Sequence, residues 1–142
     1  MNHEPVSLFI GWLKTLPGLS AVASRIASQV ADDTQLPAIA VVNATGAPIA
    51  DAGGIDTIYD WTFTVYCIAG KTGVGSDYPD YQTAAQLAGA VVDGCRAVAG
   101  GDHYATTAGA RLIDLEVVAM TRTVDEGGNA IVTLTVDARV SD

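Results

Sequence analysis

The segment Gly70-Lys71-Thr72 has the residue types of a phosphate-binding loop, and it lies between a predicted strand and a predicted helix. In such a loop, backbone N–H groups and a lysine hold the phosphates of a nucleotide, and the pattern requires a glycine five residues before Gly70. Position 65 is a valine, and about ten residues, Pro79 among them, separate the strand from the helix. We therefore interpret Gly70–Pro79 as a glycine-rich surface loop.

Gly73-Val74-Gly75 begins a second nucleotide pattern, the fingerprint of dinucleotide-binding domains. The third glycine position of that fingerprint holds Tyr78, and no parallel strand–helix–strand unit follows. The sequence therefore predicts no nucleotide cofactor, and we expect no cofactor of another kind.

Histidine and cysteine, the residues suited to nucleophilic or metal chemistry, occur twice each, as His3, His103, Cys67 and Cys95. Both cysteines point toward the core by the periodicity of their elements, so a Cys/His catalytic pair is not expected. A disulfide between them is possible in principle, but two buried free thiols are the favoured interpretation. No CxxC, HxxxH or EF-hand spacing occurs, so we predict no metal site, no catalytic residue and no enzymatic activity.

Four carboxylates fall on the polar side of separate predicted strands: Asp60, Asp114, Glu116 and Asp137. Paired carboxylates can do acid–base work when a cleft holds them. Their neighbours are Thr and Tyr, and no cleft is indicated, so the pattern favours a solvated acidic sheet face.

The composition limits which partners the chain can bind. Its 142 residues are 49% hydrophobic, and 16 acidic residues against 7 basic ones give a formal charge of −9. No basic stripe could neutralise phosphates, so gripping duplex DNA from outside is not expected. Apolar runs are shorter than the roughly 20 residues of a membrane helix, and the N-terminus lacks the cationic start of a signal peptide. We expect a soluble protein made in a reducing cytoplasm, with no membrane partner.

The first third of the chain predicts a helix over Pro5–Leu16 that Pro17-Gly18 ends. One apolar stripe of this helix is expected to be buried: Val6, Phe9, Ile10 and Leu13. A second stripe, Leu8 and Trp12, widens the apolar surface. Leu19–Val30 is ambiguous between helix and strand, with strand slightly favoured.

The remaining elements follow from alternation and from turn residues. We predict strands over Leu36–Val42 and Thr57–Ala69, loops over Asn43–Gly54 and Gly70–Pro79, and a helix over Asp80–Ala99. A hairpin closes the chain, with strands Arg111–Val124 and Ile131–Val140 around the turn Asp125–Asn129; the first strand is expected to turn Ile113, Leu115, Val117 and Ala119 inward. The expected fold is a single α+β domain over residues 1–142, a mainly antiparallel sheet of four to five strands with two helices on one face.

The order of these elements resembles the tail terminator (tail completion) proteins of long-tailed bacteriophages, and it is similar to related neck and minor tail proteins. The resemblance covers nearly the whole chain. It rests on the opening helix with its Pro17-Gly18 stop, Leu36-Pro37 before a strand, the aromatic strand Tyr59–Cys67, and the alanine-rich helix Asp80–Val98 before a hairpin.

The resemblance implies a virion protein at the head-proximal end of the tail. Such proteins form a homo-oligomeric ring, usually of six subunits, that caps the tail tube, stops its polymerisation and joins it to the connector of the head. DNA passes through the ring without specific binding, and an anionic lumen suits that passage. On this basis we expect the four carboxylates near the lumen.

The contacts of such a ring are also expectations. Leu8 and Trp12 are candidates for the subunit interface, because their stripe exceeds what one small core needs. The candidates for tube or connector contact are loop residues: Lys71, Asp125, Glu126 and Asn129. The loop Asn43–Gly54 belongs to the same group. Two alternatives stay open: a different neck or tail-tube component of similar fold, and a small ligand-binding or enzymatic α+β domain that uses the loop Gly70–Pro79.

Overall fold

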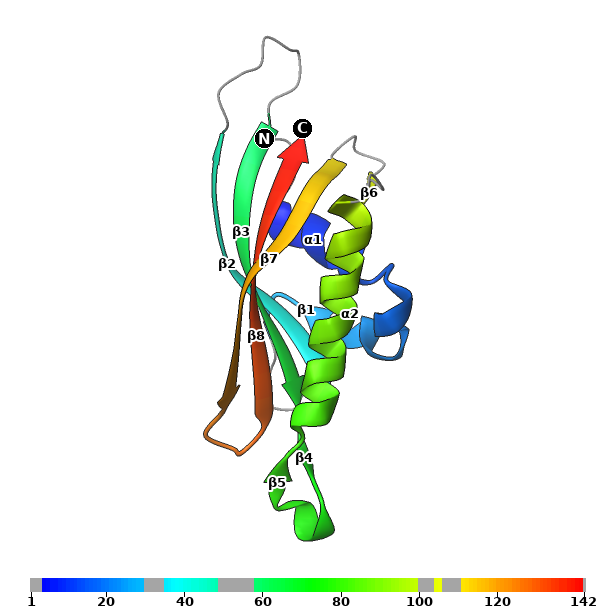
Figure 1. Cartoon of the computed structure of the whole chain (residues 1–142), viewed down its shortest axis with the longest axis vertical. Helices are drawn as coiled ribbons and strands as arrows, with labels where there is room; N and C mark the ends of the chain where they lie inside the picture. The colour runs from blue at the N-terminus through cyan, green and yellow to red at the C-terminus, as the bar shows by residue number, and fades with distance from the viewer. Residues whose placement is uncertain (1–3, 30–34, 49–57, 100–103, 106–110, 142) are drawn as a thin grey trace.

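The computed structural model describes residues 4–29, 35–48, 58–99, 104–105 and 111–141, and it shows a long, bent sheet with helices along one side (Figure 1). In chain order the elements are α1 (Pro5–Leu13), the 3-10 helix η1 (Pro17–Arg25), β1 (Ile26–Ala27), β2 (Ala38–Pro48), β3 (Ile58–Ala69), β4 (Lys71–Thr72), the 3-10 turn η2 (Val74–Ser76), β5 (Tyr78–Pro79), α2 (Tyr81–Ala99), β6 (Tyr104–Ala105), β7 (Arg111–Val124) and β8 (Ala130–Ser141).

The main sheet has the strand order β1-β2-β3-β8-β7-β6. Its four long strands, β2, β3, β8 and β7, pair antiparallel, whereas the two-residue β1 runs parallel to β2 at one border. The predicted α+β class with a mainly antiparallel sheet is confirmed.

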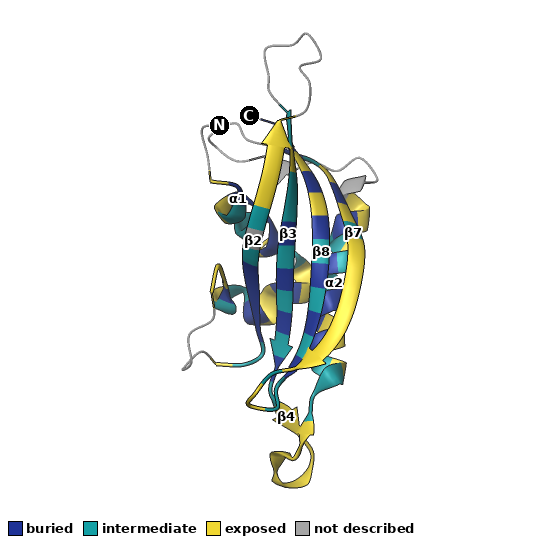
Figure 2. Cartoon of the chain, turned by 90° about the vertical axis from the view of Figure 1, so that its left-hand side faces the viewer, coloured by how far each residue is buried: buried dark blue, intermediate teal, exposed yellow. Residues whose placement is uncertain are grey.

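Helices α1, η1 and α2 lie on the same face of the sheet, and the opposite face is open to solvent (Figure 2). The core between them forms around Phe9 of α1, whose ring stacks on Phe63 of β3 with 4.5 Å between centroids. Val65 and Cys67 of β3 and Val91 of α2 extend this core and are fully buried. Covering one face with helices leaves the other to polar side chains, as the alternation of β3 and β8 predicted.

Helix α1 begins where predicted, because the Glu4 carboxylate accepts hydrogen bonds from the backbone N–H groups of Val6 (3.0 Å) and Ser7 (2.6 Å). The buried stripe differs from the predicted one: Val6 and Ile10 are only partly buried. Leu8 and Trp12 occupy the core in their place, beside Phe9 and Leu13. The helix carries apolar residues around most of its surface, so its contacts with the sheet decide which face is buried.

The segment after α1 was predicted less well. Leu19–Val30 was expected to favour a strand, but Pro17–Arg25 is a 3-10 helix, and only Ile26–Ala27 is a strand. Strand β2 continues to Pro48, through the first half of the predicted loop Asn43–Gly54; residues 49–54 lie outside the described part.

The predicted loop Gly70–Pro79 is an ordered projection rather than an irregular loop. β4 pairs with β5, with Lys71 opposite Pro79 and Thr72 opposite Tyr78, and we call residues 70–79 the arm. Asp80 then starts α2, because its carboxylate accepts hydrogen bonds from the Thr83 backbone N–H (3.1 Å) and hydroxyl (2.6 Å). The arm extends beyond the end of the sheet (Figure 1).

The closing hairpin has the predicted strands, but β7 contains irregularities that change which side chains face the core. Its register against β8 shifts between Leu112 and Asp114, and again between Val117 and Ala119. Leu112 is therefore buried where Ile113 was predicted, while Leu115 is buried as predicted and Ala119 is exposed. A bulge shifts the alternation of every later residue by one position.

Candidate assembly surfaces

Four carboxylates from three strands meet on the open face of the sheet. β3 carries Asp60, β8 carries Asp137, and β7 carries Asp114 and Glu116. The strand register places these carboxylates in two rows, and each row has one residue from β3, one from β8 and one from β7. The first row is Asp60, Arg139 and Asp114, and the second is Thr62, Asp137 and Glu116. We call these six residues the acidic lattice. The sequence predicted that the four carboxylates share one face, and in the structure they line a shallow hollow of about 240 Å³.

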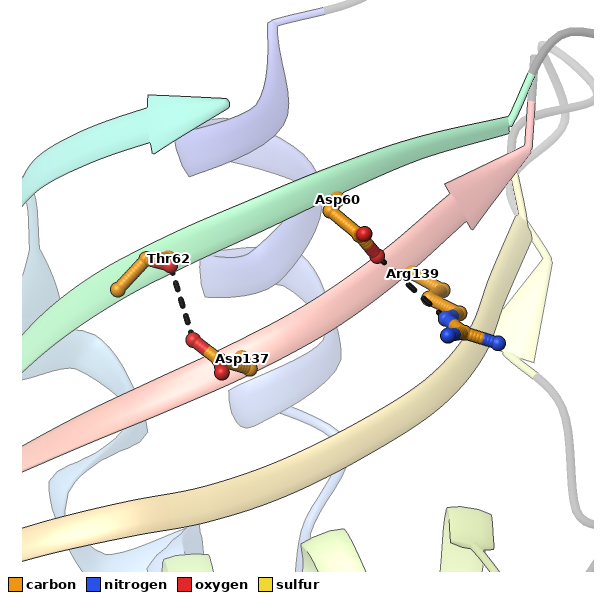
Figure 3. Close-up of polar contacts among 4 residues, drawn as sticks. All are labelled: Asp60, Thr62, Asp137 and Arg139. Carbon is orange, nitrogen blue, oxygen red and sulfur yellow. Dashed lines mark hydrogen bonds and ion pairs between the residues drawn. The ribbon is translucent and has the colours of Figure 1, made fainter. Parts of the chain in front are cut away.

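Two polar contacts organise the acidic lattice (Figure 3). Arg139 Nε lies 3.4 Å from Asp60 Oδ1, and the Thr62 hydroxyl donates a hydrogen bond of 2.9 Å to Asp137 Oδ1. Glu116 lies directly opposite Asp137 in the antiparallel register, an arrangement in which like charges repel. One guanidinium therefore stands among four carboxylates, and the surface is strongly anionic.

Water reaches this lattice freely, which limits its chemistry. The side chains of Asp60 and Arg139 are 60% and 58% exposed. Carboxylates that act as general acids at neutral pH need a desolvated setting, and this one is solvated. The arrangement suits electrostatic repulsion or attraction across a surface better than bond-breaking chemistry.

At one end of the molecule the arm lies against the β7–β8 turn, which brings three of the predicted contact residues together. The Asp125 carboxylate accepts hydrogen bonds from the Asn129 backbone N–H (2.8 Å) and side-chain amide (2.9 Å). Lys71 packs on this turn, since a Cβ added at Gly128 would lie 2.7 Å from Lys71 Cε. Glu126, the fourth candidate, is exposed in the same turn.

The charge of Asp125 follows from that turn. Partial desolvation alone would raise the pKa of its carboxyl. Hydrogen bonds from the Asn129 side chain and from the backbone N–H groups of Asn129, Gly127 and Gly128 outweigh that effect, so the pKa lies below its ordinary value. Asp125 is thus negatively charged near neutral pH, in a turn that its own hydrogen bonds join.

Leu8 and Trp12 do not form the expected subunit contact surface. Their side chains are only 5% and 3% exposed, because they pack into the core of their own chain. The width of the apolar surface on α1 is explained within the chain, where Trp12 lies beside Phe9 with 5.5 Å between ring centroids.

Strand β7 carries an exposed apolar surface that the sequence analysis missed. Val118, Met120 and Val124 are 48%, 56% and 46% exposed. The alternation predicted Ile113, Leu115, Val117 and Ala119 to face inward, which left these three residues on the outward side, but the sequence analysis did not single them out as a surface. Large exposed apolar side chains at a sheet border are typical of contact surfaces.

The two cysteines are free and buried, as predicted. Burial raises the pKa of each thiol to about 12, which keeps both protonated and unreactive near neutral pH. His3 and His103 lie outside the described residues. Within the described residues, no cluster of three or more His, Cys, Asp or Glu side chains could hold a metal ion, and no helix is long and apolar enough to cross a membrane.

Comparison with known proteins gives a likeness of fold. No protein-family model and no curated protein sequence matches the chain. Its fold is similar to a chain in a solved structure of the virion of a native gene transfer agent particle, with a TM-score of 0.63 and 19% sequence identity. The match covers 95% of this chain and 92% of the other, so the two chains share nearly their entire fold.

Proposed function

We propose that this protein is a structural component of a phage-like virion, and specifically a tail terminator. The observation that supports it best is the fold shared with a virion chain over 95% of the length of this chain. The resemblance to tail terminators in element order and local sequence patterns points to the same class of particle. In this proposal the protein acts by assembly and not as an enzyme, and the residues 1–142 work as one domain.

The acidic lattice suits the lumen of a ring through which DNA moves. Anionic walls repel phosphates, so the duplex slides without sites that hold it. The lattice lies on the face of the sheet opposite the described helices α1, η1 and α2, where the sheet itself would be the wall (Figure 2). We assign Asp60, Asp114, Glu116 and Asp137 to the lumen side.

The end formed by the arm and the β7–β8 turn suits contact with a second protein. This end carries positive and negative side chains, and hydrogen bonds within the turn fix part of its surface. Its residues are Lys71, Asp125, Glu126 and Asn129. We propose that this end contacts either the tail tube or the head connector. The subunits would then join laterally into a ring.

The direct test is electron microscopy of the purified protein, alone and mixed with the tail-tube protein from the same particle. A terminator gives discrete rings alone or on tube ends, and tube length stays finite when it is present. A tube component of similar fold would instead give long tubes by itself. Finding neither rings nor any association with tubes would count against a tail role of either kind.

A further inference from the structure

In the part of the chain that the structure describes, the outer edge of β7 is uncovered along most of its length. β6 pairs with β7 only at Leu112 and Arg111, and within the described residues no strand pairs with its outer side from Asp114 to Val124. Uncovered edges are templates for pairing with another chain, and proteins that must stay single protect them with lysine or proline. The segment 117–124 contains neither residue type.

The same strand carries exposed apolar side chains. Of the five large hydrophobic side chains that are exposed in the described part of the chain, three, Val118, Met120 and Val124, lie on β7. The other two, Val74 and Tyr78, lie on the arm. Open hydrogen-bonding groups and apolar side chains therefore coincide on one strand segment.

Among the described residues, the opposite border of the sheet has a second uncovered edge. β1 pairs with β2 only at Ile39 and Ala40, so the described chain leaves the outer side of β2 open from Val41 to Pro48. This stretch contains no carboxylate, and neither does the segment 117–124 of the β7 edge, although the formal charge of the chain is −9. Asp114 and Glu116 lie at the other end of the β7 edge, next to β6. Two copies can thus approach along these borders without the like-charge repulsion that the acidic lattice would impose.

Strand direction allows the two edges to join. The order β2, β3, β8, β7 is antiparallel at every step, so β7 runs opposite to β2. When copies stand side by side with the same axial orientation, as in any cyclic ring, β7 of one copy meets β2 of the next in antiparallel orientation. The exposed parts of the two strands lie toward opposite ends of the sheet (Figure 2), which suits the strand stagger of a closed sheet.

We propose that β7 of one copy pairs with β2 of a second copy, so that the sheet continues from subunit to subunit and the acidic lattices align on one side. The contact is heterologous, since it joins two different edges, and it can therefore close into a ring. The inference deepens the proposed function by naming the subunit contact of the ring.

The test introduces a charge on one edge at a time. Met120→Lys places an unpaired cation where the next β2 would pack, and Val74→Lys on the arm is the control with the same change of charge. We expect Met120→Lys to raise the dissociation constant of self-association at least about tenfold, because the cation would be buried without a partner. Val74→Lys should change it less than about twofold. Sedimentation velocity over a concentration series measures the dissociation constants of both variants. Circular dichroism verifies that they fold. If Met120→Lys does not fold, Val118→Lys replaces it.

Mixing two blocked variants tests which edges meet. Thr45→Lys blocks the β2 edge, while Met120→Lys blocks the β7 edge, so each variant alone should stay monomeric. Mixed in equal amounts they retain one compatible junction, and native mass spectrometry should find a one-to-one dimer and nothing larger. Wild-type protein that stays monomeric up to millimolar concentration, or variants that assemble as the wild type does, would overturn the inference.

These outcomes separate the subunit contact from the virion role. Rings that form equally well with Met120→Lys would disprove the edge pairing and leave the terminator proposal intact. Long tubes that both lysine variants abolish would support the edge pairing and exclude the terminator.

Discussion

Cys67 and Cys95 lie in the packed interior between the sheet and α2, where burial raises the pKa of each thiol to about 12. An unfolded thiol releases its proton near pH 9. Between these values the unfolded chain binds fewer protons than the folded one, so the free energy of unfolding falls as pH rises from about 9 to about 12, by about 1.4 kcal/mol per pH unit for each thiol. Below pH 9 this contribution is fully present.

Denaturant unfolding at several alkaline pH values measures that dependence. The Cys67→Ala/Cys95→Ala variant should show a clearly flatter decline, because the two buried thiols that lose protons on unfolding are gone. Iodoacetamide near pH 8 should modify the unfolded wild type at both positions and the folded protein at neither. Rapid alkylation of the folded chain would show that the thiols are more accessible than the structure has them.

Within the acidic lattice, Asp137 and Arg139 have opposite electrostatic effects. Asp137 faces Glu116 across the strands, so Asp137→Asn should raise the free energy of unfolding by a few tenths of a kcal/mol, since the amide still accepts the Thr62 hydrogen bond. Arg139 lies between Asp60 and Asp114, so Arg139→Gln should lower the free energy of unfolding by up to about 1 kcal/mol.

Urea unfolding at low and high salt distinguishes these electrostatic effects from packing effects. Both differences should shrink in about 1 M salt, where the Debye length falls to about 3 Å. Two changes of the same sign, or changes that salt leaves untouched, would contradict this account of the lattice.

At the scale of elements, two glycines give opposite predictions. A Cβ at Gly89, in the middle of α2, would meet nothing within 4 Å, so Gly89→Ala should stabilise the protein by about 0.5–1 kcal/mol through helix propensity. A Cβ at Gly18 would lie 2.8 Å from the Cβ of Ala90, so Gly18→Ala should push η1 away from α2 and destabilise by about 1–3 kcal/mol. Thermal unfolding of the two variants, compared with the wild type, should show shifts of opposite sign.

The strands that were predicted well are those whose alternation is uninterrupted. Phe63, Val65 and Cys67 on β3, and Val132 and Leu134 on β8, are buried as the period of two required, because the backbone of a regular strand fixes which side chains share a face. The grouping of the four carboxylates on the open face followed from the same rule.

Elements that depend on distant contacts were predicted less well. Nothing in the residue types around Ile113 marks the bulge that turns Leu112 inward in its place. Helix α1 is apolar on several sides, and the stacking of Phe9 on Phe63, from the middle of the chain, selects the buried one. Lys71 packs on the β7–β8 turn, more than fifty positions along the chain, and no local sequence pattern indicates such a contact.

At the scale of the whole molecule, the formal charge of −9 is distributed unevenly. Carboxylates gather on the open sheet face, whereas the described lateral edges at 41–48 and 117–124 carry none. A chain arranged in this way can join its copies edge to edge while presenting one anionic surface. The distribution of charge, more than its total, connects the fold to assembly around DNA.

Reversing one lattice charge should therefore change how the assembled protein meets DNA. Glu116→Lys exchanges an exposed carboxylate for an ammonium group in every subunit of a ring, and we expect DNA binding that weakens steeply with salt, because each phosphate contact releases counterions. In virions, ejection of the genome should slow.

Asp93→Lys is the matched control: it changes the net charge equally, but Asp93 lies on α2, on the helical side of the sheet (Figure 2), where it is 80% exposed. DNA affinity measured over a salt series, together with ejection kinetics, distinguishes a local from a global effect. If both variants bind DNA equally, or if Glu116→Lys particles eject at the wild-type rate, the open face does not line the passage, and the lattice would have to be assigned to an outer surface instead.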